Sequence, residues 1–240
     1  MSYTVCITGT TRGIGLELAK QYAEAGWKVL ACSRHPEAVA LQTLKNLNSN
    51  LSILELDVCN QRHIEKLARD LQDTPIDLLI NSAGIYSKEE ENDEDTQTLE
   101  AVSLENMQAV FRTNSIAPLM ISQALLNNLM ISQLKTNVTI TSRVGSISDN
   151  LSGGSYAYRA SKAAVNMVMK GLAVDLYSKK IKVLLLHPGW VKTDMGGPEA
   201  PIDVTSSVRG MRTVINEKIK EQIPDTENLF FNYRGESLPW

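Results

Sequence analysis

The chain has 240 residues, of which 43% are hydrophobic and 21% charged, and its formal net charge is −3. This composition is typical of a globular protein, and it provides no basic footprint for nucleic acid. No apolar run approaches the ~20 residues that a membrane span needs, and the opening residues do not resemble a signal peptide. Three cysteines without CxxC spacing and three widely separated histidines predict reduced thiols, no metal site and a cytoplasmic protein.

Short apolar runs typical of buried parallel strands alternate with helical patterns along the whole chain. The strands are predicted at 3–8, 28–32, 51–56, 77–81, 136–141 and 181–186, with a further edge strand at 229–231. Helices are predicted at about 14–25, 36–48, 61–72, 100–131, 155–178 and 204–220. The alternation predicts one α/β domain over 1–240, a doubly wound parallel sheet of Rossmann type with helices on both faces.

One segment stands apart from this alternation. The acidic run Glu89-Glu-Glu-Asn-Asp-Glu-Asp95 follows the end of a predicted strand. A charge run of this kind usually forms a solvated loop. The alternative is a mobile acidic flap beside the mouth of the active site.

The first predicted strand leads into the glycine-rich segment Thr8-Gly-Thr-Thr-Arg-Gly-Ile-Gly15 and then into a helix. Gly9, Gly13 and Gly15 allow a tight turn and bring a phosphate close to the backbone and the helix N-terminus. Because the turn lies between the first strand and the first helix, it predicts a dinucleotide-binding site.

The end of the second predicted strand indicates which dinucleotide binds. A site that prefers NAD usually has an acidic residue there to bind the ribose 2′-OH, whereas this strand ends in Ser33 and Arg34. Arg34 and Arg12 can pair with a 2′-phosphate, and Ser33 can add a hydroxyl donor. We therefore expect NADP(H) to be favoured over NAD(H).

Tyr158 and Lys162 are four residues apart in the helix predicted at 155–178, so they lie on one face of it. A nearby cation favours the phenolate, and we expect Lys162 to lower the pKa of Tyr158 from its ordinary value of about 10. A phenol tuned in this way is a usable general acid or base. His187 precedes Pro188 at a strand end, and for it we expect a packing or hydrogen-bonding role.

These motifs, in this order and at these element ends, resemble the short-chain dehydrogenase/reductase family over essentially all 240 residues. The family patterns are TGxxxGxG, an aspartate after the third strand, NNAG, a helix asparagine, a serine, YxxxK and PG. Here they correspond to the glycine turn, Asp57, Asn81-Ser-Ala-Gly84, Asn114, Ser142, Tyr158 with Lys162, and Pro188-Gly189 with Thr193. The segments 158–164, 187–197 and 231–240 are similar to the C-factor and sniffer-type carbonyl reductase branch. Ser82 replaces the second asparagine of the family's NNAG pattern. Ser146 is an alternative to Ser142 for the role of the catalytic serine.

The resemblance implies a catalytic tetrad of Asn114, Ser142, Tyr158 and Lys162. Tyr158 would protonate the developing alkoxide, Ser142 would hydrogen-bond the carbonyl oxygen, and Asn114 would hold a water that links Lys162 to solvent. The residues expected to bind the cofactor lie in the turn, at the strand ends and in the tetrad: Gly9, Arg12, Gly13, Ile14, Gly15, Ser33, Arg34, Asp57, Val58, Asn81, Ala83, Gly84, Tyr158, Lys162, Pro188, Gly189, Val191 and Thr193.

The expected activity is the reduction of a carbonyl by NADPH, with an apolar aldehyde, ketone or quinone as substrate. Apolar residues of a substrate loop at about 190–207, among them Trp190 and Met195, favour such a substrate. The alternative is a C-factor-like signalling or regulatory protein that binds the cofactor with little turnover. The family also implies a homodimer or homotetramer paired through the helices predicted at 100–131 and 155–178.

Overall fold

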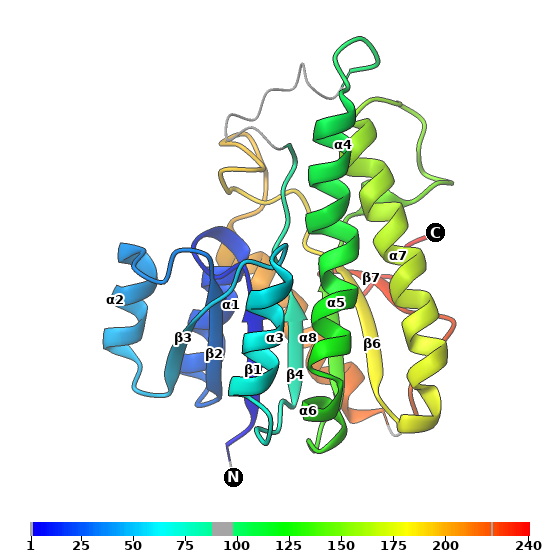
Figure 1. Cartoon of the computed structure of the whole chain (residues 1–240). Helices are drawn as coiled ribbons and strands as arrows, with labels where there is room; N and C mark the ends of the chain where they lie inside the picture. Colours follow the sequence, from blue (N-terminus) through cyan, green and yellow to red (C-terminus); the bar gives the residue numbers. More distant parts are fainter. Residues whose placement is uncertain (1, 88–97, 222) are drawn as a thin grey trace.

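A computed structural model describes residues 2–87, 98–221 and 223–240. Its centre is a seven-stranded sheet in the order β3-β2-β1-β4-β5-β6-β7, in which all neighbours are parallel (Figure 1). The strands are β1 (Thr4–Thr8), β2 (Lys28–Ser33), β3 (Leu51–Glu55), β4 (Leu78–Asn81), β5 (Thr136–Ile140), β6 (Lys182–His187) and β7 (Phe230–Asn232). This is the predicted doubly wound sheet of Rossmann type, and β7 confirms the edge strand expected at 229–231.

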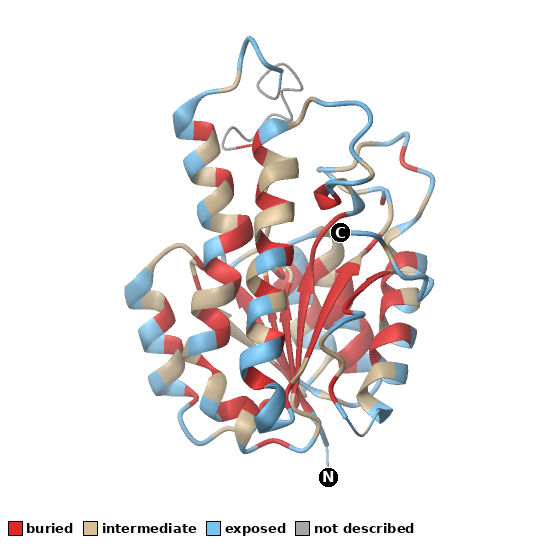
Figure 2. Cartoon of the chain, turned by 90° about the vertical axis from the view of Figure 1, so that its right-hand side faces the viewer, coloured by how far each residue is buried: buried red, intermediate tan, exposed pale blue. Residues whose placement is uncertain are grey.

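Helices cover both faces of the sheet. One face packs against α1 (Gly13–Glu24), α2 (Val39–Leu47) and α8 (Val204–Lys220). The other packs against α3 (Gln61–Asp70), α5 (Ala117–Ala124), α6 (Leu126–Met130) and α7 (Tyr156–Leu176). The strands other than the edge strand β3 are mostly buried, as Figure 2 shows, which explains why they read in the sequence as apolar runs.

The helix predicted over 100–131 is interrupted in the structure. It begins at Leu104, where the Ser103 hydroxyl caps the first turn, and α4 ends at Phe111. A π-helical turn, η2 (Arg112–Ile116), then inserts before α5. Such π turns recur at functional sites, and this one contains Asn114.

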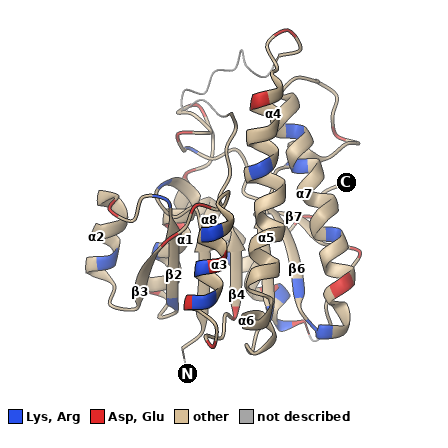
Figure 3. Ribbon diagram, viewed as in Figure 1, with Lys and Arg blue, Asp and Glu red and all other residues tan. Residues whose placement is uncertain are grey.

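Other boundaries differ from the predicted ones by a few residues. The largest shift is at α2, which starts at Val39 rather than 36, and short 3₁₀ turns occupy η3 (Arg143–Gly145) and η4 (Tyr177–Lys179). The acidic run 89–95 lies outside the described residues. Basic and acidic residues both occur along the helices, as the colouring of the ribbon in Figure 3 shows. None of the described helices is long and apolar enough to cross a membrane.

Candidate active site

Because every strand of the sheet is parallel, the segments that follow β1 to β6 all emerge at one edge. The chain moves outward in opposite directions from β1 and from β4, and ligands of open α/β sheets bind at such a switch point. The glycine turn follows β1, Ser33 ends β2, Asn81 ends β4, and Ser142 and Pro188 follow β5 and β6. The fold therefore gathers the motifs found in the sequence along the carboxyl-terminal edge of the sheet.

The glycine turn is packed too closely for larger residues. Gly9 has a φ of +73°, and a Cβ there would lie 2.7 Å from the Ala83 Cα. A Cβ on Gly15 would lie 2.1 Å from the Gly9 carbonyl oxygen. The Arg12 side chain does not cap α1, so the first-turn amides keep their capacity for an external anion. These features fit the diphosphate of a dinucleotide.

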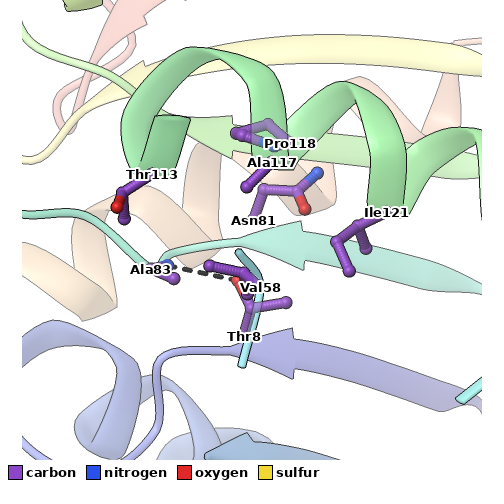
Figure 4. Close-up of a pocket in the computed structure, with 8 residues that line it drawn as sticks. All are labelled: Thr8, Val58, Asn81, Ala83, Thr113, Ala117, Pro118 and Ile121. Carbon is purple, nitrogen blue, oxygen red and sulfur yellow. Dashed lines mark hydrogen bonds between the residues drawn. The ribbon is translucent and has the colours of Figure 1, made fainter. Parts of the chain in front are cut away.

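The Thr8 hydroxyl joins β1 to β4 beneath the turn. It accepts hydrogen bonds from the backbone N–H groups of Ser82 and Ala83, each at 3.1 Å. Figure 4 shows these strand ends around a small gap that is closed on the other side by η2 and α5. Because the Ser82 side chain is not needed for this link, serine in place of the family's asparagine leaves it intact.

Tyr158 and Lys162 lie together, with the Lys162 Nζ 5.5 Å from the centre of the Tyr158 ring. The ammonium donates a 3.0 Å hydrogen bond to the Ile140 carbonyl rather than to the phenol oxygen. Burial raises the pKa of Tyr158 to about 12, and the hydrogen bond with Ser142 offsets only part of this rise. The expectation that the pKa of Tyr158 lies below its ordinary value is therefore wrong for this structure, because burial outweighs the effect of the nearby lysine.

Burial also acts on Lys162, lowering its pKa to about 8. The lysine is 5% exposed, and its ammonium lies against the Ile140 carbonyl at the end of β5. At neutral pH Tyr158 therefore carries its proton and Lys162 is charged, which suits a phenol that donates a proton to a developing alkoxide.

The two candidate serines differ in what they contact. Ser142 follows β5 directly, and its hydroxyl hydrogen-bonds Tyr158. Ser146 is 1% exposed, and its hydroxyl donates to the Trp240 carbonyl oxygen at 3.0 Å. The structure thus places Ser142 beside the phenol and turns Ser146 toward residue 240.

The Asn114 side chain makes three hydrogen bonds to protein groups. Its Oδ1 accepts from the Ile85 N–H at 2.9 Å, and its Nδ2 donates to the Ile85 carbonyl at 2.8 Å and to the Ser161 hydroxyl at 3.1 Å. A Cβ on Gly84 would lie 3.3 Å from that Oδ1 and 3.7 Å from the Lys162 Nζ. Asn114 is therefore close to Lys162, and the expected water could be held by the second lone pair of its Oδ1 or by its main chain.

The residues predicted to bind the adenosine lie after β2 and β3, at the β3 side of the sheet. The Ser33 hydroxyl bonds Thr11 at 2.7 Å and accepts from the His35 N–H, while Arg34 is exposed. Asp57 accepts from the Cys59 N–H at 2.9 Å, and Val58 is buried beside it. Ser33 and Arg34 are consecutive residues at the carboxyl-terminal end of β2.

Arg12 extends in a different direction. It forms a 2.9 Å ion pair with Asp194 in the loop after β6, and both side chains are about 70% exposed or more. Gly13 also approaches the Thr193 side chain, since a Cβ there would lie 3.4 Å from the Thr193 methyl. The glycine turn therefore lies beside the loop that follows β6, and the Arg12 guanidinium is paired there with Asp194.

The remaining predicted residues lie at the ends of β4 and β6. Asn81 is 3% exposed, and its side-chain amide donates to Asn137 and Ser122. The amide is therefore engaged within the protein interior. Gly189 has a φ of +86°, as the turn after Pro188 requires. Val191 pairs with Ile202, which closes the base of the loop 190–207.

His187 lies at the end of β6 near Lys162 and Arg143. Burial first, and then those two cations, lower its pKa to about 4. The imidazole is therefore neutral at physiological pH, which agrees with the expected packing role rather than acid catalysis. Within the described part of the chain, no group of three or more His, Cys, Asp or Glu residues could hold a metal ion.

Tyr86 and Ser155 belong to the site, but sequence reasoning missed both. The Tyr86 ring lies 5.1 Å from the Tyr158 ring, and its hydroxyl is 2.8 Å from the Ser155 hydroxyl. The only sequence signal was an aromatic residue two positions after Gly84 at a strand end, and such a signal is weak.

Comparison with known proteins now identifies the family. The family model described as short chain dehydrogenase matches residues 3–201. The chain belongs to that family. It is 40% identical to "C-signal" of Myxococcus xanthus over 166 residues, covering 69% of this chain and 93% of that protein.

Two solved carbonyl reductases of the same fold resemble the whole chain. The carbonyl reductase Sniffer of D. melanogaster is 33% identical with a TM-score of 0.86, and the match covers 100% of both chains. The NADPH-bound carbonyl reductase from chicken fatty liver is 32% identical with a TM-score of 0.85, covering 100% of this chain and 99% of that one. The chain is thus an oxidoreductase of Rossmann fold.

Proposed function

We propose that this oxidoreductase uses NADPH to reduce the carbonyl group of an apolar aldehyde, ketone or quinone. The observation that carries the proposal is the position of Ser142, Tyr158 and Lys162. The three side chains lie together at the strand ends, next to a glycine turn that fits a diphosphate. The likeness to two carbonyl reductases supports the same reaction.

Each residue of this group has a distinct task. Ser142 donates a hydrogen bond to the carbonyl oxygen and polarises it, as donors of an oxyanion hole do. Tyr158, protonated at neutral pH, gives its proton to the oxygen as negative charge develops there. Lys162 places a positive charge beneath the phenol ring and stabilises the tyrosinate that results. The nicotinamide, when bound, supplies the hydride.

NADPH is the proposed cofactor because of the end of β2. Arg34 is exposed there next to the Ser33 hydroxyl, and no carboxylate follows β2 directly to accept from a ribose 2′-OH. A guanidinium and a hydroxyl suit a 2′-phosphate. Arg12 is a weaker candidate than the sequence suggested, because it pairs with Asp194.

The proposed substrate is apolar because of the loop 190–207. Trp190 is 57% exposed and Met195 40% exposed, and the Trp190 Nε1 donates to the Gly196 carbonyl within the loop. The indole is thereby fixed against its own loop with its ring accessible. A planar hydrophobic carbonyl compound suits this surface better than a charged acid.

We also propose a homodimer formed through α4 and α7, as the family resemblance implies. Leu104 on α4 is 75% exposed, and Met167 and Val174 on α7 are 72% and 56% exposed. Val110, Val165 and Met169 on the same helices are fully buried in the monomer, whereas Phe111 and Val168 are half-buried. Sedimentation of the wild type against Met167→Glu tests this assembly.

A second candidate is a signalling or regulatory protein that binds the cofactor with little turnover. The 40% identity to "C-signal" favours it. The intact group of Ser142, Tyr158 and Lys162 argues against it, since binding alone does not need a proton donor.

A panel of apolar aldehydes, ketones and quinones, followed by NADPH absorbance, separates the two candidates. The reductase proposal expects turnover with at least one of them. Tight NADPH binding without turnover on the whole panel would favour the regulatory role.

A further inference from the structure

The catalytic phenol has an aromatic neighbour to which no role has been assigned. Tyr86 comes from the segment after β4, 72 residues before Tyr158 in the chain, yet the two rings lie 5.1 Å apart at 47°. This is within the range of tilted aromatic pairs that attract one another. Tyr86 therefore limits the positions that the Tyr158 ring can take.

Tyr86 is itself held at both ends. On the main-chain side, Ile85 is fixed through its N–H and its carbonyl by the amide of Asn114. On the other side, the Tyr86 hydroxyl lies 2.8 Å from the Ser155 hydroxyl. Asn114 also donates to Ser161 on α7, so the same amide ties Tyr86's segment to the catalytic helix.

Ser155 has an unusual conformation for the residue that precedes a helix. Its φ and ψ are 47° and 42°, in the left-handed region, and its hydroxyl does not cap α7. Serine in front of a helix normally uses that hydroxyl to accept from a first-turn amide. Here the hydroxyl is directed to Tyr86 instead. A strained non-glycine residue persists where its surroundings determine it, and such residues cluster at functional sites.

We propose that Tyr86 is a positioning residue for Tyr158, bracing the phenol through its ring and the first turn of α7 through Ser155. The inference rests on the proposed function, in which Tyr158 donates the proton. Proton transfer requires the phenol to be within hydrogen-bond reach of the substrate oxygen, so a small displacement lowers turnover. We expect this bracing contact to affect the proton transfer and not the binding of the cofactor, because the glycine turn proposed to bind the cofactor lies in another part of the site.

Two single variants remove the same hydrogen bond from opposite sides. Tyr86→Phe and Ser155→Ala should each lower kcat about three- to tenfold, with little change in KM or in the dissociation constant of NADPH. The double variant should be no worse than either single one, because both delete one interaction. Tyr86→Leu, which also removes the ring, should lower kcat further, by at least about tenfold. Tyr177→Phe, at an exposed tyrosine beyond the end of α7, is the control.

Ser155→Gly distinguishes the effect of the Ser155 hydroxyl from the effect of its left-handed backbone conformation. Glycine adopts the left-handed conformation freely but lacks the hydroxyl. The brace predicts that Ser155→Gly remains as slow as Ser155→Ala. Wild-type kcat in Ser155→Gly would overturn the proposal, as would kcat within twofold of the wild type in Tyr86→Leu.

Hydrogen exchange gives a readout that does not depend on activity. Amides in residues 156–160 should exchange faster in Tyr86→Phe and Ser155→Ala than in the wild type or in Tyr177→Phe. If the wild type reduces no carbonyl and exchange still rises, the brace stands and the proposed function fails. If the wild type is active and neither exchange nor kcat changes in these variants, the brace is refuted and the proposed function stands.

Discussion

Replacing Lys162 by methionine should change how the stability of the protein depends on pH. Lys162 is 5% exposed, and burial lowers its pKa from the ordinary 10.5 to about 8. The folded state therefore binds this proton less tightly than the unfolded chain does. The charged lysine destabilises the fold fully below about pH 8, and this cost is lost as pH rises toward 10.5.

The magnitude follows from the shift. One pKa unit corresponds to about 1.4 kcal/mol, so the cost is about 3 kcal/mol at pH 7 and under about 1 kcal/mol at pH 10. The hydrogen bond from Lys162 to the Ile140 carbonyl is also lost in Lys162→Met. In the folded state at pH 10 the lysine is a neutral amine, which still donates this bond but more weakly than the ammonium. The variant therefore loses a hydrogen bond at both pH values, and the part that favours the charged form is already contained in the pKa of Lys162.

The assay is urea unfolding of the wild type and of Lys162→Met at pH 7 and pH 10. The free energy of unfolding of the wild type, relative to the variant, should rise by about 2–3 kcal/mol between the two pH values. Lys66→Met is a control, because the Lys66 side chain is 67% exposed. A wild-type-to-variant difference that stays constant within about 0.5 kcal/mol would refute the reasoning about buried charge.

Three further predictions concern single residues of the site. Ser142→Ala should lower kcat by about a hundredfold, the loss typical of an oxyanion donor, and Ser146→Ala should lower kcat less. Steady-state kinetics of both variants on one substrate gives the ranking. The opposite order would assign the contact with the substrate carbonyl to Ser146. Arg34→Ala should weaken NADPH about ten- to a hundredfold and leave NADH nearly unchanged in fluorescence titrations, and an equal loss for both would make Arg34 an ordinary surface cation. His187→Gln should leave the pH–rate profile between pH 5 and 8 unchanged, because the pKa of His187 is already near 4; the disappearance of a transition near pH 6.5 would contradict this.

The fold was predictable because its signals are local. Buried parallel strands read as apolar runs, and the glycine turn, NSAG segment and PG motif each stand at a strand end, where parallel strands must bring them together. The family pattern added the identity of the tetrad. The choice of Ser142 over Ser146 also followed from its place directly after a strand, and the contact between Ser142 and Tyr158 agrees with it.

The features that could not be predicted depend on contacts between distant segments. The spacing of Tyr158 and Lys162 places both on one helix face. It does not show that the Lys162 ammonium donates its hydrogen bond to the Ile140 carbonyl. Burial then outweighs the cation and reverses the expected direction of the tyrosine pKa shift. Tyr86 meets Tyr158 only in the folded chain, and the π turn at Asn114 has no signature in the sequence.

The claim that Tyr158 donates the proton during NADPH-dependent carbonyl reduction is tested most directly by Tyr158→Phe. The measurement is turnover by NADPH absorbance on the best substrate of the panel, together with the dissociation constant of NADPH for the same preparation. We expect turnover to fall by at least about a hundredfold while NADPH binding and the fold are retained. Turnover near that of the wild type on any reducible carbonyl would contradict the assignment of Tyr158 and the mechanism built on it.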